Sequence, residues 1–209
     1  MANSKKTLLH IGCGKQSFEA LPPLDWAGEW RQLRVDIDPA VKPDIVASMT
    51  DMHMVDSGSI DFVFSKHNIE HLESHDVSIA LGEFYRVLKP TGFLVCRCPD
   101  LSAIAERIVT RDPEETLWVS ELDDGSQVKV ALIDMIYGAR SEIAGGKPFM
   151  AHRTGFTRES LKRHLASAGF EGSNVSREPK RMELLCNARK EEQGNLFYQL
   201  NRRPIGPQP

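Results

Sequence analysis

The sequence predicts an α/β fold built on a doubly wound, mostly parallel seven-stranded sheet with an antiparallel edge. Short apolar runs alternate with segments of helical spacing, which is typical of parallel strands joined by right-handed crossovers. A glycine turn directly follows the first apolar run. The last two apolar runs are separated only by a turn at Pro179, which indicates an antiparallel edge.

Length and composition fit a single globular domain. The chain has 209 residues, of which 41% are hydrophobic and 26% charged, and its net charge is -3. Such a balance provides no bulk attraction to nucleic acid or membrane, so neither is expected as a partner. The four cysteines lack zinc-site spacing, and we find no signal peptide or long apolar run, so we expect a reduced, cytoplasmic protein.

The predicted strands are apolar runs rich in β-branched and aromatic residues. Five of them should be parallel, at residues 7–11, 32–37, 43–47, 59–65 and 93–98. The closing pair is predicted at residues 171–177 and 182–188.

Three helices are predicted between and after these strands. Residues 76–88 have an apolar helical face, and the Lys-Pro-Thr-Gly of residues 89–92 should end that helix. Asp100 and Thr157 are candidate N-caps for helices over residues 101–109 and 158–168. The pair Pro22-Pro23 argues against a long helix after the first strand.

Residues 111–155 interrupt this alternation with acidic runs, glycines and a proline, and hold a helical piece near residues 127–137. We expect an insertion outside the sheet. Insertions in doubly wound sheets lie over the carboxyl ends of the strands, so this one should form a lid over the ligand. We expect one domain over residues 1–209, and we expect its Pro- and Gly-rich residues 201–209 to be disordered.

The glycine turn Gly12-Cys13-Gly14 follows the first strand, where a ligand can approach the backbone closely. The third glycine of a dinucleotide fingerprint is missing, which disfavours a pyrophosphate ligand. Asp36 ends the second strand and can accept hydrogen bonds from both hydroxyls of a ribose. Asp38 shares its face and competes for that role, and both can also be read as solvated strand-end acids.

Several stretches together resemble the class I methyltransferases that use S-adenosyl-L-methionine (SAM), in particular the small-molecule type. They are LLHIGCGK at 8–15, RVDIDP at 34–39, TDMHMVDSGSIDFVFSKHNIEHL at 50–72, EFYRVLKPTGFLVCRCPD at 83–100 and GFTRESLKRHLASAGF at 155–170. The most specific part is Arg-Val-Leu-Lys-Pro-x-Gly. The resemblance spans about two thirds of the chain and implies the Rossmann-like methyltransferase fold, with SAM as the cofactor.

The resemblance also implies a set of cofactor-binding residues. Gly12, Cys13 and Gly14 would line the methionine part of SAM, Asp36 would hold the ribose, Ile37 would pack on the adenine, Ser48, Met49 and Asp51 would lie at the adenine edge, and Ser65, Lys66 and His67 would flank the methionine. The chain departs from the family where relatives often carry an adenine-binding Asp after the third strand, a position that aligns with Ser48. The helix after the second strand is also almost absent.

Two histidines are candidate catalytic residues. His67 leaves the fourth strand directly. His152, late in the insertion, could take a proton from an acceptor hydroxyl or amine, or be an ordinary surface residue. Methyl transfer from a sulfonium depends mainly on alignment of the two reactants, so a base is needed only if the acceptor must lose a proton.

Other charged and histidine side chains have a second interpretation. His67, His71 and His75 are spaced by four, which suits a metal only if they share one helical face; the stretch is only partly helical, and no metal is expected. His10, inside the first strand, is expected in the core. The basic residues of the insertion would suit an anionic acceptor or simply be solvated: Arg140, Lys147 and Arg153.

The function that follows is methyl transfer from SAM to a small-molecule acceptor, by a chain that is either a monomer or a homodimer. One alternative is a degenerate SAM-binding domain with a scaffold role. Another is a nicotinamide-dependent oxidoreductase, which the incomplete glycine fingerprint disfavours. A nucleic-acid methyltransferase is disfavoured because no Asn-Pro-Pro-Tyr-like tetrad follows the fourth strand.

Overall fold

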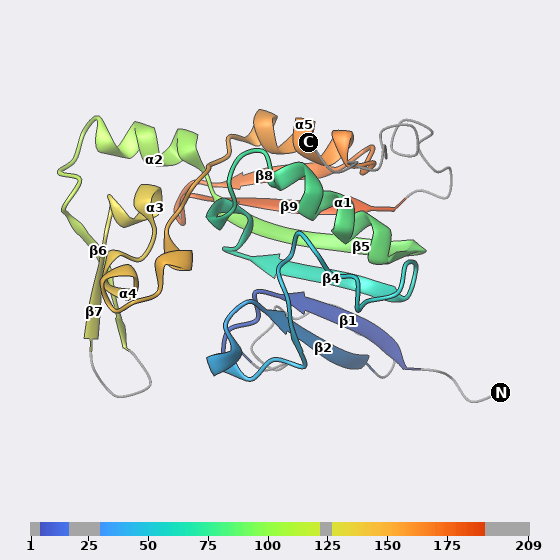
Figure 1. Cartoon of the computed structure of the whole chain (residues 1–209). Helices are drawn as coiled ribbons and strands as arrows, with labels where there is room; N and C mark the ends of the chain where they lie inside the picture. Colours follow the sequence, from blue (N-terminus) through green and yellow to red (C-terminus); the bar gives the residue numbers. More distant parts are fainter. Residues whose placement is uncertain (1–4, 17–29, 122–126, 191–209) are drawn as a thin grey trace, which may run out of the picture.

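A computed structural model describes residues 5–16, 30–121 and 127–190. Expectations for Pro22-Pro23 and for residues 201–209 concern segments outside these ranges. Within the described part, seven strands form one sheet of order β3-β2-β1-β4-β5-β9-β8 (Figure 1). Their bounds are β1 Lys6–Ile11, β2 Trp30–Asp36, β3 Ile45–Val46, β4 Ile60–Lys66, β5 Leu88–Pro99, β8 Asn174–Glu178 and β9 Glu183–Arg189.

The pairing confirms the predicted topology. Strands β1 to β5 are mutually parallel, while β9 runs antiparallel to both β5 and β8. The sheet is therefore the mostly parallel, doubly wound sheet with an antiparallel edge that the alternating pattern predicted.

Strand β5 begins earlier than predicted. The expected turn residues 89–92 lie inside the strand, where they bulge out of the β4–β5 ladder between the pairs Ile60–Leu88 and Phe62–Phe93. A bulge accommodates Pro90, which cannot donate to a neighbouring strand. The helix before it nevertheless ends as predicted, because α1 spans Val77–Val87.

The predicted helix caps are confirmed. Asp100 accepts a hydrogen bond from the Ser102 amide at 3.0 Å and begins α2, Leu101–Ile108. Thr157 forms a capping box with Ser160 and begins α5, Arg158–Ser167. Figure 1 shows α1 and α5 side by side along the sheet, where the rings of Tyr85 and Phe170 lie 5.2 Å apart.

Alternation along the central strands separates two apolar clusters. One cluster contains Leu9 and Val63 together with the helices, and the other contains Leu8, Phe62 and Phe64 on the opposite face. Both faces of the sheet are thus buried, as expected for parallel strands. No helix among the described residues is long and apolar enough to cross a membrane.

The insertion lies beyond one end of the sheet (Figure 1). It contains an antiparallel pair, β6 Thr116–Glu121 and β7 Gln127–Ala131, the helices α3 Asp134–Tyr137 and α4 Arg140–Ala144, and the 3-10 helix η4 Pro148–Met150. Residues 127–131 are therefore strand and not helix, because their exposure alternates with period two. The segment returns to the main sheet where the amides of Arg153 and Thr154 donate to the Glu70 carbonyl at 2.8 and 3.1 Å.

Candidate functional site

Two cavities adjoin at the ends of β1 and β4, where ligands bind in doubly wound sheets. The larger, of about 420 Å³, extends from the glycine turn across the ends of β2 and β3. The smaller, of about 250 Å³, lies between the main sheet and the insertion. Both are lined by His67, His71 and Met150, so the two cavities share a wall.

The glycine turn borders the larger cavity and depends on a residue that the sequence analysis missed. Gly12 has a φ of +61°, and a Cβ added there would lie 1.8 Å from Oδ1 of Asn68. Asn68 in turn donates to the carbonyls of Ile11 and Lys66, each at 2.9 Å. Only glycine therefore fits at position 12. The available signal for Asn68 was its position two residues after the end of β4, in a polar loop.

Asp36 is oriented by backbone amides at the edge of the larger cavity. Its carboxylate accepts hydrogen bonds from the Gly14 amide at 2.8 Å and the Asp38 amide at 2.9 Å. Asp38 instead caps the short 3-10 helix Pro39–Val41 through the Ala40 amide. The structure thus separates the two candidate acids, because Asp36 lines the cavity and Asp38 lies outside its lining.

Next to Asp36, Ile37 is 55% exposed and lines the larger cavity. Ser48, Met49, Lys66 and His67 line the same cavity, as the resemblance implied.

Three predicted residues lie outside the lining of this cavity. Cys13 is buried, and burial raises the pKa of its thiol. Ser65 is buried, and its hydroxyl accepts a hydrogen bond from Asn68 at 3.2 Å. Asp51 is exposed and pairs with His53 at 2.9 Å, and that hydrogen bond lowers the pKa of Asp51. Successive residues of a turn or strand point in opposite directions, which the motif alone does not resolve.

His67 lies in the shared wall, with a φ of +55°. Its Nε2 is 3.0 Å from Oε1 of Glu183, and its Nδ1 is 3.3 Å from Oε1 of Glu70. Burial by itself lowers the pKa of His67, but the two carboxylates outweigh burial and raise the pKa to about 9. At neutral pH the ring is an imidazolium with both nitrogens facing carboxylates, so it has no lone pair with which to accept a proton.

His152 lines the smaller cavity and not the larger one. Its Nδ1 lies 3.2 Å from the Met135 carbonyl. Because a carbonyl only accepts, Nδ1 carries the proton, and Nε2 of the neutral ring keeps its lone pair. Burial lowers the pKa of His152, which favours this neutral form.

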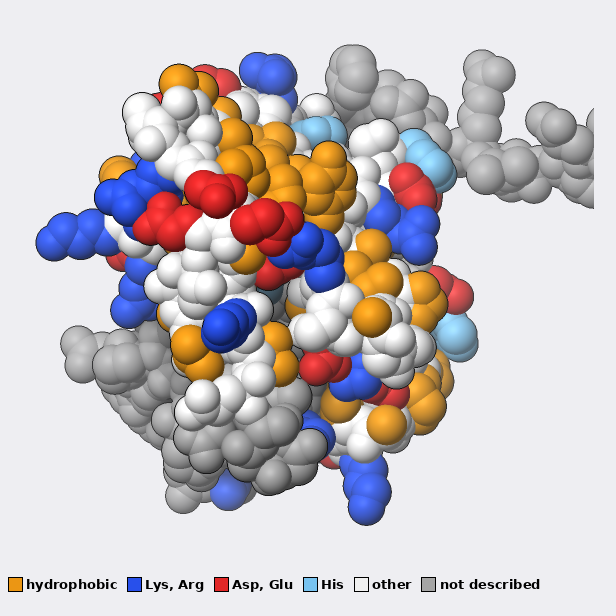
Figure 2. Space-filling view, turned by 90° about the vertical axis from the view of Figure 1, so that its left-hand side faces the viewer, with side chains coloured by type: hydrophobic (Ala, Val, Ile, Leu, Met, Phe, Trp, Pro, Cys, Tyr) orange, Lys and Arg blue, Asp and Glu red, His pale blue; other side chains and the backbone are white. Residues whose placement is uncertain are grey.

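The smaller cavity is walled mainly by apolar side chains, most of them from the insertion. They are Pro99, Trp118, Val128, Val130, Met135, Ala139 and Met150. Figure 2 views the molecule from the side of the insertion and shows acidic and basic side chains close together among apolar ones.

The three basic residues that could have suited an anionic acceptor are each paired with a carboxylate. Arg140 donates to Asp134 and Glu114, Lys147 donates to Glu142 at 2.6 Å, and Arg153 donates to Glu73 at 2.7 Å. These three cations therefore give no argument for an anionic acceptor, although Lys129 and Arg181 also line the smaller cavity.

Residues 9–96 match the family model of a methyltransferase domain. No curated protein sequence matches the chain. Solved structures share its fold at low identity. The CMeT domain of the citrinin polyketide synthase is 13% identical with a TM-score of 0.57, and the match covers 92% of this chain and 48% of that one. A SAM-dependent methyltransferase from Archaeoglobus fulgidus is 15% identical with a TM-score of 0.55, over 89% of this chain and 86% of that one.

A third structure contains bound ligands. The 1,6-didemethyltoxoflavin-N1-methyltransferase of Burkholderia thailandensis, with 1,6-didemethyltoxoflavin and S-adenosylhomocysteine, is 13% identical with a TM-score of 0.52, over 90% of this chain and 72% of that one. The chain spans less than two thirds of some of these structures: 48% of the citrinin synthase domain and 62% of a protein from Bordetella parapertussis.

Proposed function

We propose that this chain, a class I SAM-dependent methyltransferase by its fold and its methyltransferase domain, transfers a methyl group to a small molecule held in the smaller cavity. One observation carries the proposal. The two cavities share a wall formed by His67, His71 and Met150, so ligands in the two cavities would meet there.

The larger cavity fits SAM. Asp36 is held by two amides and keeps lone pairs for the ribose hydroxyls, and the exposed Ile37 beside it offers an apolar surface to the adenine. Gly14 leaves room for close approach to the backbone, because no described atom lies within 4 Å of the place a Cβ would take. When bound, SAM supplies a methyl group on a sulfonium. The chain's contribution is alignment, which can lower a barrier by roughly 7–11 kcal/mol.

The smaller cavity fits an acceptor with an apolar body. Its apolar wall and volume of about 250 Å³ suit a small molecule and not a polymer. On our proposal, His152 accepts a hydrogen bond from the acceptor's hydroxyl or amine through Nε2, because Nδ1 is bound to the Met135 carbonyl. His67, charged and doubly paired, positions Glu70 and Glu183 and does not act as a base.

The insertion supplies much of the acceptor wall, which supports the proposal that it is a lid. The same proposal places the chain in the cytoplasm. Its four cysteines are buried free thiols, the state expected in a reducing compartment.

Calorimetry with S-adenosylhomocysteine tests the cofactor assignment. We expect binding in the micromolar range or tighter for the wild-type chain and for His152→Ala, with dissociation constants within about twofold of each other. His152→Ala should lose turnover on acceptors found by screening small molecules with SAM. The matched control His75→Ala, an exposed histidine, should keep both.

Other outcomes favour the alternatives. No heat at millimolar S-adenosylhomocysteine, together with binding of a nicotinamide dinucleotide, would support the oxidoreductase. Tight binding without turnover on any acceptor would support the scaffold role.

A further inference from the structure

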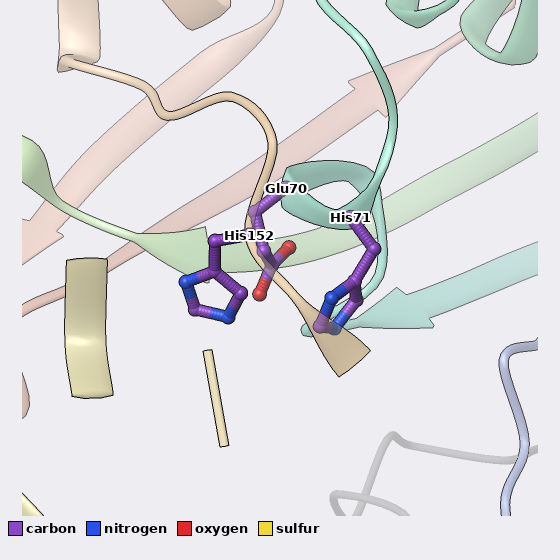
Figure 3. Close-up of side chains that lie close together, drawn as sticks. All are labelled: Glu70, His71 and His152. Carbon is purple, nitrogen blue, oxygen red and sulfur yellow. The ribbon is translucent and has the colours of Figure 1, made fainter. Parts of the chain in front are cut away.

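Glu70, His71 and His152 meet where the insertion returns to the sheet, and each offers a side-chain ligand atom within 4.8 Å of the other two (Figure 3). This is not the set that the sequence spacing suggested. Ile69–His71 forms a single 3-10 turn, and His75 is exposed beside Asp76. The partner of His71 is instead His152, whose ring centroid lies 4.9 Å away.

Both imidazoles are held by backbone carbonyls. Nδ1 of His71 lies 3.1 Å from the Ala151 carbonyl, and Nδ1 of His152 lies 3.2 Å from the Met135 carbonyl. Each Nδ1 therefore donates a hydrogen bond, and Nε2 of each ring is the nitrogen left to bind a ligand. Metal-binding histidines typically show this arrangement, in which the second nitrogen donates to a carbonyl and orients the ring.

The carboxylate of Glu70 provides independent evidence for a cation. The side chain is 1% exposed, and neither oxygen has a hydrogen-bond partner among the described residues. His67 forms an ion pair with Oε1 at 3.3 Å, outside hydrogen-bond geometry. Oε2 of this buried carboxylate has no hydrogen bond among the described residues, which is costly, and a bound cation would satisfy it. Figure 3 shows this carboxylate between the two histidine rings.

We propose that Glu70, His71 and His152 bind one divalent transition-metal ion of the zinc or iron(II) class, with an open coordination position toward the smaller cavity. Two imidazoles and one carboxylate are the ligand set that such ions take at catalytic sites. Ligand atoms around tetrahedral zinc lie about 3.3 Å apart, so the three side chains must close by roughly 1–1.5 Å. Mg²⁺ prefers oxygen ligands and should bind more weakly.

The proposed ion would lie where it could bind the acceptor. His71 and His152 both line the smaller cavity, and His71 also lines the larger one. An ion held by them would occupy the Nε2 lone pair of His152. The ion itself would then hold an oxygen or nitrogen of the acceptor at the junction of the two cavities, in place of the direct hydrogen bond to His152. This role rests on the proposed function, but binding of the ion does not.

The test is a titration of the tag-free full-length chain, stripped of metal by a chelator, with Co²⁺ and then with Zn²⁺ in competition against a chromophoric chelator. We expect one ion per chain and a visible Co²⁺ absorption that Zn²⁺ abolishes. His71→Ala, His152→Ala and Glu70→Gln should each weaken Zn²⁺ binding by at least about 100-fold, whereas His75→Ala should not change it. Mg²⁺ at the same concentration should leave Co²⁺ bound.

Binding of S-adenosylhomocysteine, measured on the same samples, reports whether each variant is folded. A His152→Ala chain that still binds S-adenosylhomocysteine but not Zn²⁺ supports the site. Stoichiometric Zn²⁺ binding that survives His152→Ala, or a wild-type chain that binds no Zn²⁺ at micromolar concentration, overturns it. Zn²⁺ binding without S-adenosylhomocysteine binding would overturn the proposed function and leave the metal site standing.

Discussion

Glu83 and Arg86 lie one turn apart on α1 and form a two-point ion pair. Nε of Arg86 donates to Oε1 of Glu83 at 2.7 Å, and Nη2 donates to Oε2 at 2.8 Å. The other guanidinium hydrogens reach the loop after β3, at the carbonyls of Met52 and Val55 and the hydroxyl of Ser57. The arginine of the most specific sequence motif thus joins the helix to the loop that leads into β4.

Arg86→Lys should therefore not rescue Arg86→Ala. All five guanidinium hydrogens are used, and a lysine has only three donors from a single point. We expect either variant to lose about 3 kcal/mol of unfolding free energy in urea. A lysine variant as stable as the wild type would show that the loop contacts contribute little.

Asp36→Ala should weaken binding of S-adenosylhomocysteine by about 1.5–3 kcal/mol, or roughly 10- to 150-fold, because hydrogen bonds to a charged group are lost. Asp38→Ala, which removes only the cap of a short helix outside the cavity, should have a smaller effect. Calorimetry on both variants measures the difference. A larger loss of binding in Asp38→Ala than in Asp36→Ala would mean that the ribose binds to Asp38.

Gly12→Ala should cost more stability than Gly14→Ala. Both residues have a positive φ, which alone costs about 1–2 kcal/mol for an alanine. Only the Cβ at position 12 meets Asn68, whereas no described atom lies within 4 Å of one at position 14. Urea unfolding of the two variants should separate them, and equal costs would mean that Asn68 moves aside freely.

Acid should destabilise the chain through His10. Burial, followed by the nearby Arg34, lowers the pKa of His10 from 6.5 to about 4, although Asp36 opposes this shift. Above pH 6.5 the ring is neutral in both states. Below pH 6.5, His10 binds a proton in the unfolded chain but not in the folded chain, so the free energy of unfolding falls between pH 6.5 and pH 4.

We expect a loss of about 2 kcal/mol between pH 7.5 and pH 5 from His10 alone. His10→Gln should lose correspondingly less over this range, while the exposed His75→Gln should follow the wild type. Urea unfolding at both pH values gives the comparison. Parallel losses in all three chains would exclude His10 as the source.

If the insertion is a lid, its backbone amides should exchange faster than those of α5 in the free chain and slow down when S-adenosylhomocysteine binds. Phe149, Met150 and Arg153 line the larger cavity and would transmit the effect. Hydrogen exchange by mass spectrometry measures it before any acceptor is known. Exchange that is already slow, and unchanged by the ligand, would identify the insertion as a fixed wall.

Much of the scaffold could be predicted because its signals are local. A strand or helix repeats its apolar pattern within a few residues, so β1, β4, α1 and the caps Asp100 and Thr157 were found within one or two positions. Residues 127–131 were mistaken for helix because a five-residue apolar alternation is too short to separate from the helix that follows it.

The sequence also predicted that the glycine turn and Asp36 lie at one cavity, since each ends a strand and strand ends meet at one edge of a parallel sheet. The direction of the side chains could not be predicted. The sequence alone could not show that Cys13, Ser65 and Asp51 lie outside the cavity lining, because a motif names positions without the turn geometry that orients them.

By itself the sequence determined the order of the strands and helices of the main sheet, the glycine turn and the strand-end acid, because each depends on neighbouring residues. Only the tertiary structure decided that His152 meets Glu70 and His71, and that His67 lies between two carboxylates. His71 and Ala151 are 80 positions apart, and they meet because the insertion folds back and the Arg153 amide bonds to the Glu70 carbonyl. No local periodicity encodes such a contact, since it arises only when the whole chain has packed.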